Sequence, residues 1–279
     1  MDSDSESDLD SLFDEIPTES NELISYSAEG NDPEHIELAH LTPPSIDGLY
    51  FDPSICLPPE YTSTLFQKCL QTYFTNSNVN QVMLFERVSP NVTEPKEPSS
   101  PNSKLPTFLT ELLITLSSIL RPCLPVSIHS LLFPSQSASP KARQVIINHY
   151  LPGEGITPHV DLLDRFGDGI IGVSLGGSCV MRFRKVDSKE VGLRSGYHQS
   201  DEPDSDEVEN VYLPAGSVYV MSGDARYGWT HGIERRRADR VQDDPDDGEG
   251  RWIKRSVRVS ITFRWLLPGA DIVGTTADS

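Results

Sequence analysis

The segment RVSITFRW, residues 258–265, constrains the fold of this chain more than any other stretch. Side chains alternate between the two faces of a β-strand, so Val, Ile, Phe and Trp would share one face while Arg258, Ser260, Thr262 and Arg264 share the other. An ordinary amphipathic strand with its arginines in solvent would explain this pattern. A strand with an enclosed polar face would explain it as well, because the other strands of the chain read as buried. Both explanations are open at this point.

The rest of the chain divides into a helical part and a strand-rich part. Apolar residues recur at helical spacing in residues 58–74 and 105–120, with a strand-like segment at 81–88 between them. From residue 143 onward, short strand-like segments alternate with Gly, Pro or Asp: residues 143–150, 169–176, 179–186, 210–214, 217–223 and 256–267. Two helices followed by seven or eight mostly antiparallel strands predict an α+β fold, a double-stranded β-helix (jelly roll) with flanking N-terminal helices.

The N-terminal segment has a different character. Residues 1–40 contain thirteen Asp or Glu and no Lys or Arg, which predicts a disordered acidic tail, because so polar a segment cannot bury enough apolar surface to offset its ordering entropy. The formal net charge of the chain is −19, and without the tail it is −6. We expect one domain over residues 41–279, with its core at 143–267. Further polar or acidic stretches at 89–104, 201–209 and 243–250 are predicted loops.

Compartment and membrane contact follow from two simpler features. The four cysteines show no CxxC or zinc-ribbon spacing and no signal peptide precedes them, which favours a reducing compartment, cytoplasm or nucleus. The longest apolar run, LTELLITLSSIL, is too short to span a bilayer. We therefore expect no membrane partner.

Three residues supply a possible metal site. His159 and Asp161 lie two residues apart in a stretch rich in Gly and Pro, so in an extended chain both side chains point to one face. A solvated loop histidine beside a turn-capping aspartate would explain these two alone, just as a buried structural histidine would explain His231. Together they form the two-histidine, one-carboxylate facial set, which leaves three coordination positions open and selects ferrous iron in oxygenases. One position takes dioxygen and two take a chelating 2-oxo acid.

The two arginines of the last strand fit such a ligand. Arginine is the fixed-charge, bidentate receptor for carboxylates. Arg258 and Arg264 lie roughly 20 Å apart at about 3.3 Å per residue, too far for one small dicarboxylate to bridge directly. We expect one to hold a distal carboxylate and the long side chain of the other to reach toward the metal end.

Four motifs in register then carry a family resemblance: Asn148-His149-Tyr150, His159-x-Asp161, His231 and Arg258-x5-Arg264. Over about residues 143–267 the chain resembles the AlkB family of Fe(II)/2-oxoglutarate dioxygenases. The segments YLPGEGITPHVD, GVSLG, RYGWTHGI and RVSITFR are most similar to the eukaryotic branch that includes the tRNA wobble-uridine hydroxylase.

The resemblance implies roles, cofactors and chemistry. It implies iron binding by His159, Asp161 and His231, capture of the distal 2-oxoglutarate carboxylate by Arg258 and Tyr150, and a place near the chelating end for Arg264 and Asn148. For Asn148 and Tyr150, simple strand polarity is the alternative. The implied cofactor is Fe(2+) and the co-substrates are 2-oxoglutarate and O2. Conversion of 2-oxoglutarate to succinate and carbon dioxide drives oxidation of a substrate C–H bond, giving a hydroxylated or demethylated base.

Two departures from the family leave the substrate open. Bacterial repair enzymes of the family carry an acidic residue two positions after the metal aspartate, where this chain has Leu163, so a neutral target such as a wobble-uridine substituent is expected. The animal tRNA enzyme also carries an RNA-binding module and a methyltransferase, which this sequence lacks.

The partner is expected to be RNA, in first place a tRNA, with DNA and a protein side chain as alternative substrates. Basic clusters at 234–240 and 251–258, including Arg235, Arg236 and Arg237, could contact a nucleic-acid backbone or form a solvated rim. A non-catalytic protein that binds a partner protein through its acidic N-terminus is an alternative of another class. The complete metal and co-substrate set argues against it.

Overall fold

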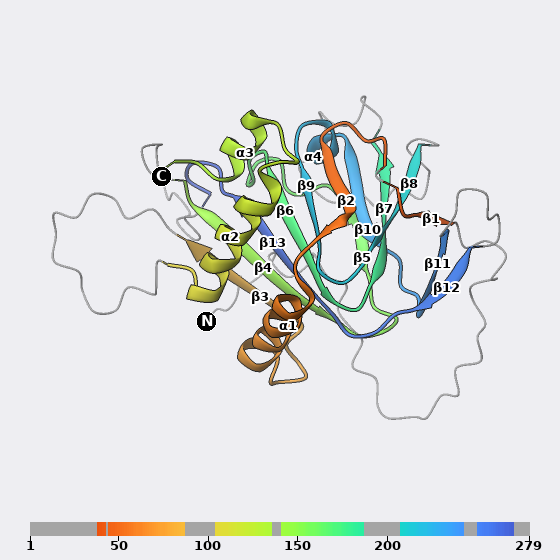
Figure 1. Cartoon of the computed structure of the whole chain (residues 1–279). Coiled ribbons are helices and arrows are strands. Elements are labelled where there is room, and N and C mark those ends of the chain that lie inside the picture. Colours follow the sequence, from red (N-terminus) through yellow and green to blue (C-terminus); the bar gives the residue numbers. More distant parts are fainter. Residues whose placement is uncertain are drawn as a thin grey trace, which may run out of the picture. The chain divides into compact units, whose positions relative to one another are not determined.

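Two β-sheets of mostly antiparallel strands form the body of the protein (Figure 1). The computed structural model describes residues 38–42, 44–86, 104–135, 141–186, 207–242 and 250–270. The first sheet has six strands in the order β2 (Leu49–Cys56), β9 (Ser217–Met221), β6 (Ile170–Gly176), β13 (Arg258–Trp265), β4 (Arg143–Tyr150) and β3 (Gln81–Glu86). The second has seven, in the order β12 (Arg251–Lys254), β11 (Ala238–Gln242), β1 (Ala39–His40), β8 (Val208–Leu213), β7 (Cys179–Lys185), β10 (Trp229–Ile233) and β5 (Ile156–His159).

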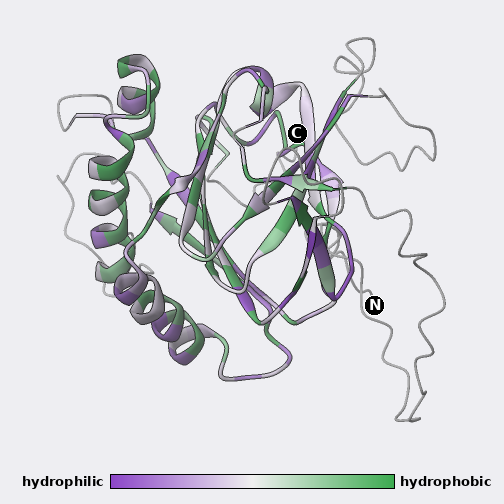
Figure 2. Ribbon diagram, turned by 45° about the vertical axis from the view of Figure 1, so that its right-hand side comes forward, coloured by the Kyte–Doolittle hydropathy of each residue, from purple (hydrophilic) through white to green (hydrophobic). Residues whose placement is uncertain are grey.

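Helices cover the outer face of the six-stranded sheet (Figure 1). They are α1 (Pro59–Tyr73), α2 (Thr107–Leu120) and α3 (Val126–Leu132). Each begins directly after a proline, whose fixed φ suits a helix start. Apolar side chains of α2 such as Leu109, Leu112 and Leu116 are fully buried in one core with Val145 and Ile147 of β4. Hydrophobic and hydrophilic residues are interspersed along the helices and strands, as expected of amphipathic elements (Figure 2).

The inner face of the six-stranded sheet is polar at its centre. Strand β13 lies between β4 and β6, and Ser260 stands opposite Asn148 on one side and Ser174 on the other. Arg258 and Arg264 are only 4% and 6% exposed. The alternative in which these arginines lie in solvent is therefore wrong. The predicted alternation is confirmed, because Val259, Ile261 and Phe263 of β13 pack in the core that contains the helices.

The fold agrees with the predicted jelly roll, although the sequence underestimated the number of strands. The helices predicted at 58–74 and 105–120 match α1 and α2, and the strand predicted at 143–150 matches β4. Short elements were missed, namely α3, the four-residue helix α4 (Asp224–Tyr227) and strands β1, β2, β5, β10, β11 and β12. None of the helices in the described ranges is long and apolar enough to cross a membrane.

Several sequence predictions lie outside the described residues. These are the disorder of residues 1–37, the loop at 89–103 and most of the loops at 201–209 and 243–250. At the margin of the predicted tail the structure adds a detail. Ala39 is fully buried and, with His40, forms β1, which pairs in parallel with β8 and β11. The last residues of the segment 1–40 therefore belong to the β-sheet.

Candidate active site

Two imidazoles face each other across adjacent strands. His159 of β5 stands directly opposite His231 of β10 in the antiparallel ladder, and their ring centroids are 4.5 Å apart. Nδ1 of His159 lies 2.9 Å from the carbonyl oxygen of Thr157 and donates to it. This hydrogen bond fixes the tautomer and leaves the Nε2 lone pair available to a ligand. The structure therefore brings two of the three predicted metal ligands together.

The third predicted ligand, Asp161, follows β5 and is 4% exposed. Its Oδ1 accepts a hydrogen bond from Nη1 of Arg264, whereas no residue in the described ranges gives a hydrogen bond to Oδ2. As the side chains stand, no group of three or more His, Cys, Asp or Glu is gathered to hold a metal ion within the part of the chain that the structure describes. The two histidines are preassembled, and the carboxylate beside them is directed to an arginine.

The charge states of these groups suit a metal. Burial alone would raise the pKa of Asp161, but Arg264, His231 and His159 outweigh it and hold that pKa well below its usual range. Burial lowers the pKa of His231 to about 3, and the neighbouring His159 acts in the same direction. Near neutral pH the site therefore presents an ionised carboxylate and a neutral imidazole at His231, the forms in which these side chains bind metals.

Arg226 of α4 fixes the loop that carries Asp161. Its Nη1 donates to the backbone oxygen of Asp161 at 2.9 Å, and its Nη2 donates to the backbone oxygens of Leu162 and Phe166 at 3.3 and 3.1 Å. Arg226 is 2% exposed. Buried carbonyl groups need partners, and one guanidinium supplies three of them here. The conformation of the 161–166 loop therefore depends on this side chain.

Arg264 links the β-sheet to Asp161. Besides its bond to the carboxylate, its Nη2 donates to Oε1 of Gln144 at 2.6 Å, and its guanidinium stacks 3.9 Å from the centroid of the Phe166 ring. These contacts hold it at the end of the polar face next to the two histidines. Its long side chain does reach toward the expected metal end.

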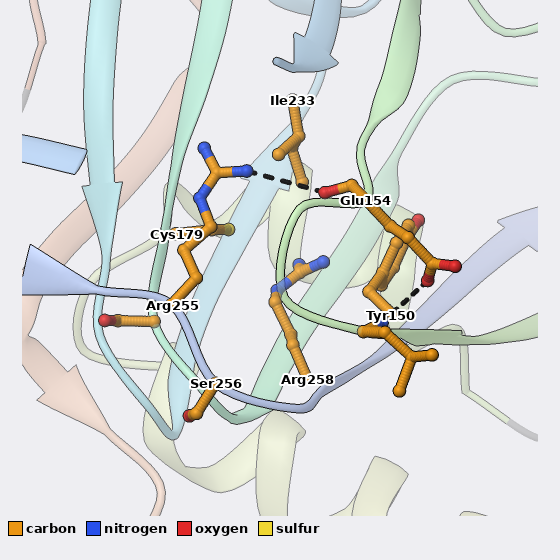
Figure 3. Close-up of a pocket in the computed structure, with 9 residues that line it drawn as sticks. Tyr150, Glu154, Cys179, Ile233, Arg255, Ser256 and Arg258 are labelled. Atoms are coloured by element: carbon orange, nitrogen blue, oxygen red, sulfur yellow. Dashed lines mark hydrogen bonds between the residues drawn. The ribbon is translucent and has the colours of Figure 1, made fainter. Parts of the chain in front are cut away.

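The other end of the polar face opens into a pocket (Figure 3). Four strands and nearby loops contribute to the pocket: β4 and the loop after it, the start of β7, the end of β10, and β13 with the segment before it. The lining residues are Tyr150, Leu151, Glu154, Ser178, Cys179, Ile233, Arg255, Ser256 and Arg258. Nε of Arg258 donates to Oγ of Ser174 at 2.8 Å, and its guanidinium lies 5.1 Å from the centroid of the Tyr150 ring. Its Nη1 is buried without a hydrogen-bond partner among the described residues. An unpaired buried guanidinium nitrogen is costly, and a carboxylate would satisfy it.

Asn148 completes the row of predicted co-substrate residues. It is 8% exposed, lies on the polar face between Tyr150 and Gln144, and its Oδ1 accepts a hydrogen bond from Nε2 of Gln81 at 2.9 Å. All four predicted co-substrate residues thus share one enclosed surface with Asp161 at its end. The free Nε2 of His159, the unbonded Oδ2 of Asp161 and the orphaned Nη1 of Arg258 fit a ferrous ion and 2-oxoglutarate.

Sequence reasoning missed Gln144, Ser174 and Arg226. Alternation along residues 143–150 places Gln144 on the face of Asn148 and Tyr150, so extending the pattern would have found it. The same applies to Ser174 in β6. Arg226 could not be found in this way, because its acceptors are backbone oxygens of a distant loop and leave no mark in the pattern of side chains.

Comparison with known proteins defines the class. The model of the 2OG-Fe(II) oxygenase superfamily matches residues 64–264. A protein from Acanthamoeba polyphaga mimivirus, "Uncharacterized protein L905", is 38% identical over 44% of this chain and 48% of its own length. The "Alkylated DNA repair protein ALKBH8 homolog" of Arabidopsis thaliana is 37% identical over 47% of this chain and 36% of its own. The "tRNA (carboxymethyluridine(34)-5-O)-methyltransferase alkbh8" of Xenopus tropicalis is 38% identical over 43% and 18%.

The chain therefore belongs to the 2OG-Fe(II) oxygenase superfamily, whose members are dioxygenases that use Fe(2+), 2-oxoglutarate and O2. Within the superfamily it is similar to proteins named as ALKBH8 or as an ALKBH8 homolog. It spans less than half the length of each of the three relatives.

Proposed function

We propose that this protein is an Fe(II)- and 2-oxoglutarate-dependent dioxygenase that oxidises a nucleic-acid base, and that its substrate is the substituent of a wobble uridine in tRNA. The observation that carries the proposal is the enclosed polar face of β13 and β4. It begins at an arginine with an unpaired nitrogen and ends on a carboxylate beside two paired imidazoles.

In this proposal His159, Asp161 and His231 hold the iron. When bound, the iron supplies the redox chemistry in which O2 and 2-oxoglutarate give succinate, carbon dioxide and one oxygen atom for a substrate C–H bond. Thr157 orients His159 through Nδ1, and Arg226 orients Asp161 through its backbone. These contacts position the ligands without touching the reacting atoms.

Arg258 and Arg264 have different roles in binding the co-substrate. Arg258 and Tyr150 bind the distal carboxylate in the pocket of Figure 3, where the burial of Arg258 strengthens the ion pair. Arg264 and Asn148 lie toward the chelating end. Because Arg264 also holds Asp161, it couples the position of the carboxylate ligand to that of the co-substrate.

The choice of tRNA rests on the relatives and on one residue. The Xenopus relative is named as a tRNA carboxymethyluridine methyltransferase, and this chain aligns with a part of it. Leu163, half-buried in the loop after Asp161, offers no negative charge to a cationic alkylated base. A neutral uridine substituent suits this environment better.

A hairpin supports contact with RNA. The two basic clusters of the sequence overlap the antiparallel strands β11 and β12. Trp252 of β12 stands opposite Arg240 of β11, and 49% of its surface is exposed. Lys254 lies on the same face as Trp252 and is also exposed. Exposed aromatic and cationic side chains together suit stacking on a base and contact with a phosphate.

The predicted basic rim needs one correction. Arg236 donates to Asp239 at 2.7 Å and to Glu234 at 2.8 Å, and its side chain is largely buried. Because its guanidinium is paired with these two carboxylates, Arg236 is not part of an RNA-binding surface. Arg237 is exposed and stays in the proposal.

The remaining assignments are proposals of the same kind. We place the dioxygenase domain at residues 41–279 together with β1 (Ala39–His40), preceded by a separate acidic N-terminal segment that could bind a partner protein. Cytoplasm or nucleus is the proposed location, in keeping with four cysteines that are all free thiols.

The test is a direct assay of product. Purified protein with iron, ascorbate and 2-oxoglutarate is incubated with tRNA carrying the unhydroxylated uridine substituent, and in parallel with oligonucleotides containing 1-methyladenine. Mass spectrometry of the nucleosides then follows a gain of one oxygen against a loss of methyl. We expect hydroxylated uridine and stoichiometric succinate.

The matched control is Asp161→Asn, which keeps an acceptor for Arg264 but removes the charge of the proposed ligand. It should yield neither product. Efficient demethylation of 1-methyladenine without hydroxylated uridine would refute the tRNA assignment while leaving the dioxygenase intact. Full succinate formation by Asp161→Asn would refute the metal site.

A further inference from the structure

Tyr219 lies on the inner polar face, and neither the proposed iron site nor the contacts of the two arginines explain its presence there. Tyr219 of β9 stands opposite Gly172 of β6, and Gly172 in turn stands opposite Thr262 of β13. A Cβ atom added to Gly172 would lie 2.0 Å from Cζ and 2.4 Å from the hydroxyl oxygen of Tyr219. The phenol ring therefore crosses β6 directly above Gly172. Glycine is required at this position by the space that the ring occupies.

This arrangement places the phenol between the two ends of the polar face. Thr262 lies on β13 between Arg258 and Arg264, so a hydroxyl above Gly172 is on the same path. Tyr219 interacts electrostatically with Arg258 at one end and with Asp161 at the other. A molecule that joins the Arg258 pocket to the two histidines has to pass this hydroxyl.

The hydroxyl of Tyr219 is unpaired within the part of the chain that the structure describes. Tyr219 is 5% exposed, and no residue in the described part of the chain forms a hydrogen bond with its hydroxyl. Buried tyrosine hydroxyls normally have a partner, and an aliphatic residue would fill the same space without leaving a polar group unpaired. Burial raises the pKa of Tyr219 above its ordinary value, so the group stays a neutral O–H donor.

We propose that Tyr219 is a co-substrate-binding residue, whose hydroxyl donates a hydrogen bond to a carboxylate oxygen of 2-oxoglutarate between Arg258 and Asp161. Gly172 is the position that makes this contact possible, since any side chain there displaces the phenol. The inference rests on the proposed function, because it takes the polar face to be the 2-oxoglutarate site.

The experiment measures binding, so that it does not depend on turnover. Calorimetry on the full chain loaded with Mn(2+) gives the dissociation constants of 2-oxoglutarate and of its unreactive analogue N-oxalylglycine. Tyr219→Phe removes only the hydroxyl and should weaken both ligands by about tenfold, the loss expected for one hydrogen bond to a charged acceptor. Mn(2+) affinity should not change.

The matched control is Tyr212→Phe, which removes the hydroxyl of another buried tyrosine, on β8 in a different cluster. It should leave both dissociation constants unchanged. Gly172→Ala should weaken 2-oxoglutarate as much as Tyr219→Phe or more. In a Tyr219→Leu background it should add little, since no phenol is left to displace. Thermal unfolding of each variant shows that it is folded.

The outcomes distinguish this inference from the proposed function on which it rests. If Arg258→Ala weakens 2-oxoglutarate and Tyr219→Phe does not, Tyr219 is only a core residue and this inference is overturned. If the wild-type chain binds neither ligand, the polar face is not a co-substrate site and both proposals are overturned. Equal weakening by Tyr212→Phe would also overturn the inference, because the effect would then be one of general stability.

Discussion

At the scale of single residues, the unpaired nitrogen of Arg258 gives the clearest test of the site. Arg258→Ala should weaken 2-oxoglutarate by tenfold or more, because a charge-assisted hydrogen bond of about 1.5–3 kcal/mol is lost. Equilibrium binding to the Mn(2+)-loaded chain measures this. The control is Arg143→Ala, a buried arginine of neighbouring β4 that stacks on Trp265 at 4.0 Å on the outer face. It should lower stability and spare 2-oxoglutarate affinity.

Arg226 gives a second residue-scale prediction. Arg226→Met fills much of the same volume but removes three hydrogen bonds to the 161–166 loop, so the free energy of unfolding should fall by about 3 kcal/mol. Metal affinity, measured at a temperature where the variant is folded, should fall by roughly 10–100-fold, as expected when the group that orients a ligand is removed. Arg226→Lys should recover part of the stability.

A variant with reduced stability and unchanged metal affinity would contradict the positioning role. In that case Arg226 would be a structural residue, and its hydrogen bond to the backbone of Asp161 would not affect metal affinity.

The alternation of side chains along a strand was enough to predict much of the site from the sequence. It placed Arg258, Ser260 and Arg264 on one face before the fold was known, and the structure confirms that face. It could not show which partners they meet. The bond from Arg264 to Asp161 joins residues 103 positions apart, and contacts at such separation depend on how the two sheets pack.

At the scale of elements, the hairpin of β11 and β12 is the feature to test. Trp252→Ala should weaken binding of tRNA about tenfold, since stacking of one base on an aromatic side chain contributes about 1–3 kcal/mol. Lys254→Gln should reduce the slope of log affinity against log salt by about one, as expected for one lost phosphate contact. Filter binding over a range of salt concentrations measures both.

The control for the hairpin is Ile114→Ala, which shortens an exposed apolar side chain on the outer surface of α2. Neither hairpin variant should change succinate formation in the absence of RNA. Unaltered tRNA affinity in both variants would show that the hairpin is a solvated rim.

The length of a helix or strand determined whether it could be predicted from the sequence. The 15-residue α1 and the eight-residue β4 show several repeats of their periodicity, and both were predicted closely. Strand β5 has four residues, one of them Pro158, and β12 has four. So few positions hold no more than two alternations, and the pairing that makes them strands comes from distant partners.

At the scale of the whole molecule, β1 determines how much of the N-terminus can be removed. A chain beginning at Leu38 keeps β1 and should match the full chain in thermal stability and in 2-oxoglutarate binding. A chain beginning at Leu41 loses Ala39, which is fully buried between two strands, and its free energy of unfolding should fall by about 1–3 kcal/mol. Calorimetric unfolding of the two chains compares them directly.

Equal stability of the two shortened chains would show that β1 contributes nothing and would restore the simpler boundary at residue 40. Composition alone could not place the boundary, because Ala39 and His40 continue an acidic segment without any change of pattern. Burial between β8 and β11 is a property of the folded sheet.

His159 lies on β5, the last strand of the seven-stranded sheet. Among the described strands, β5 pairs only with β10, in an irregular register. An end strand held on one side is the part of a sheet that opens most readily. A metal bound by His159 and His231 would join it to its neighbour, so opening β5 would require releasing the ion. Amide hydrogen exchange at residues 156–159 should then slow as metal is added, by the ratio of free metal to its dissociation constant, while exchange in β4 stays constant. The bound iron would in this way stabilise an edge strand that has one neighbour, and loss of iron would loosen the sheet at the proposed active site.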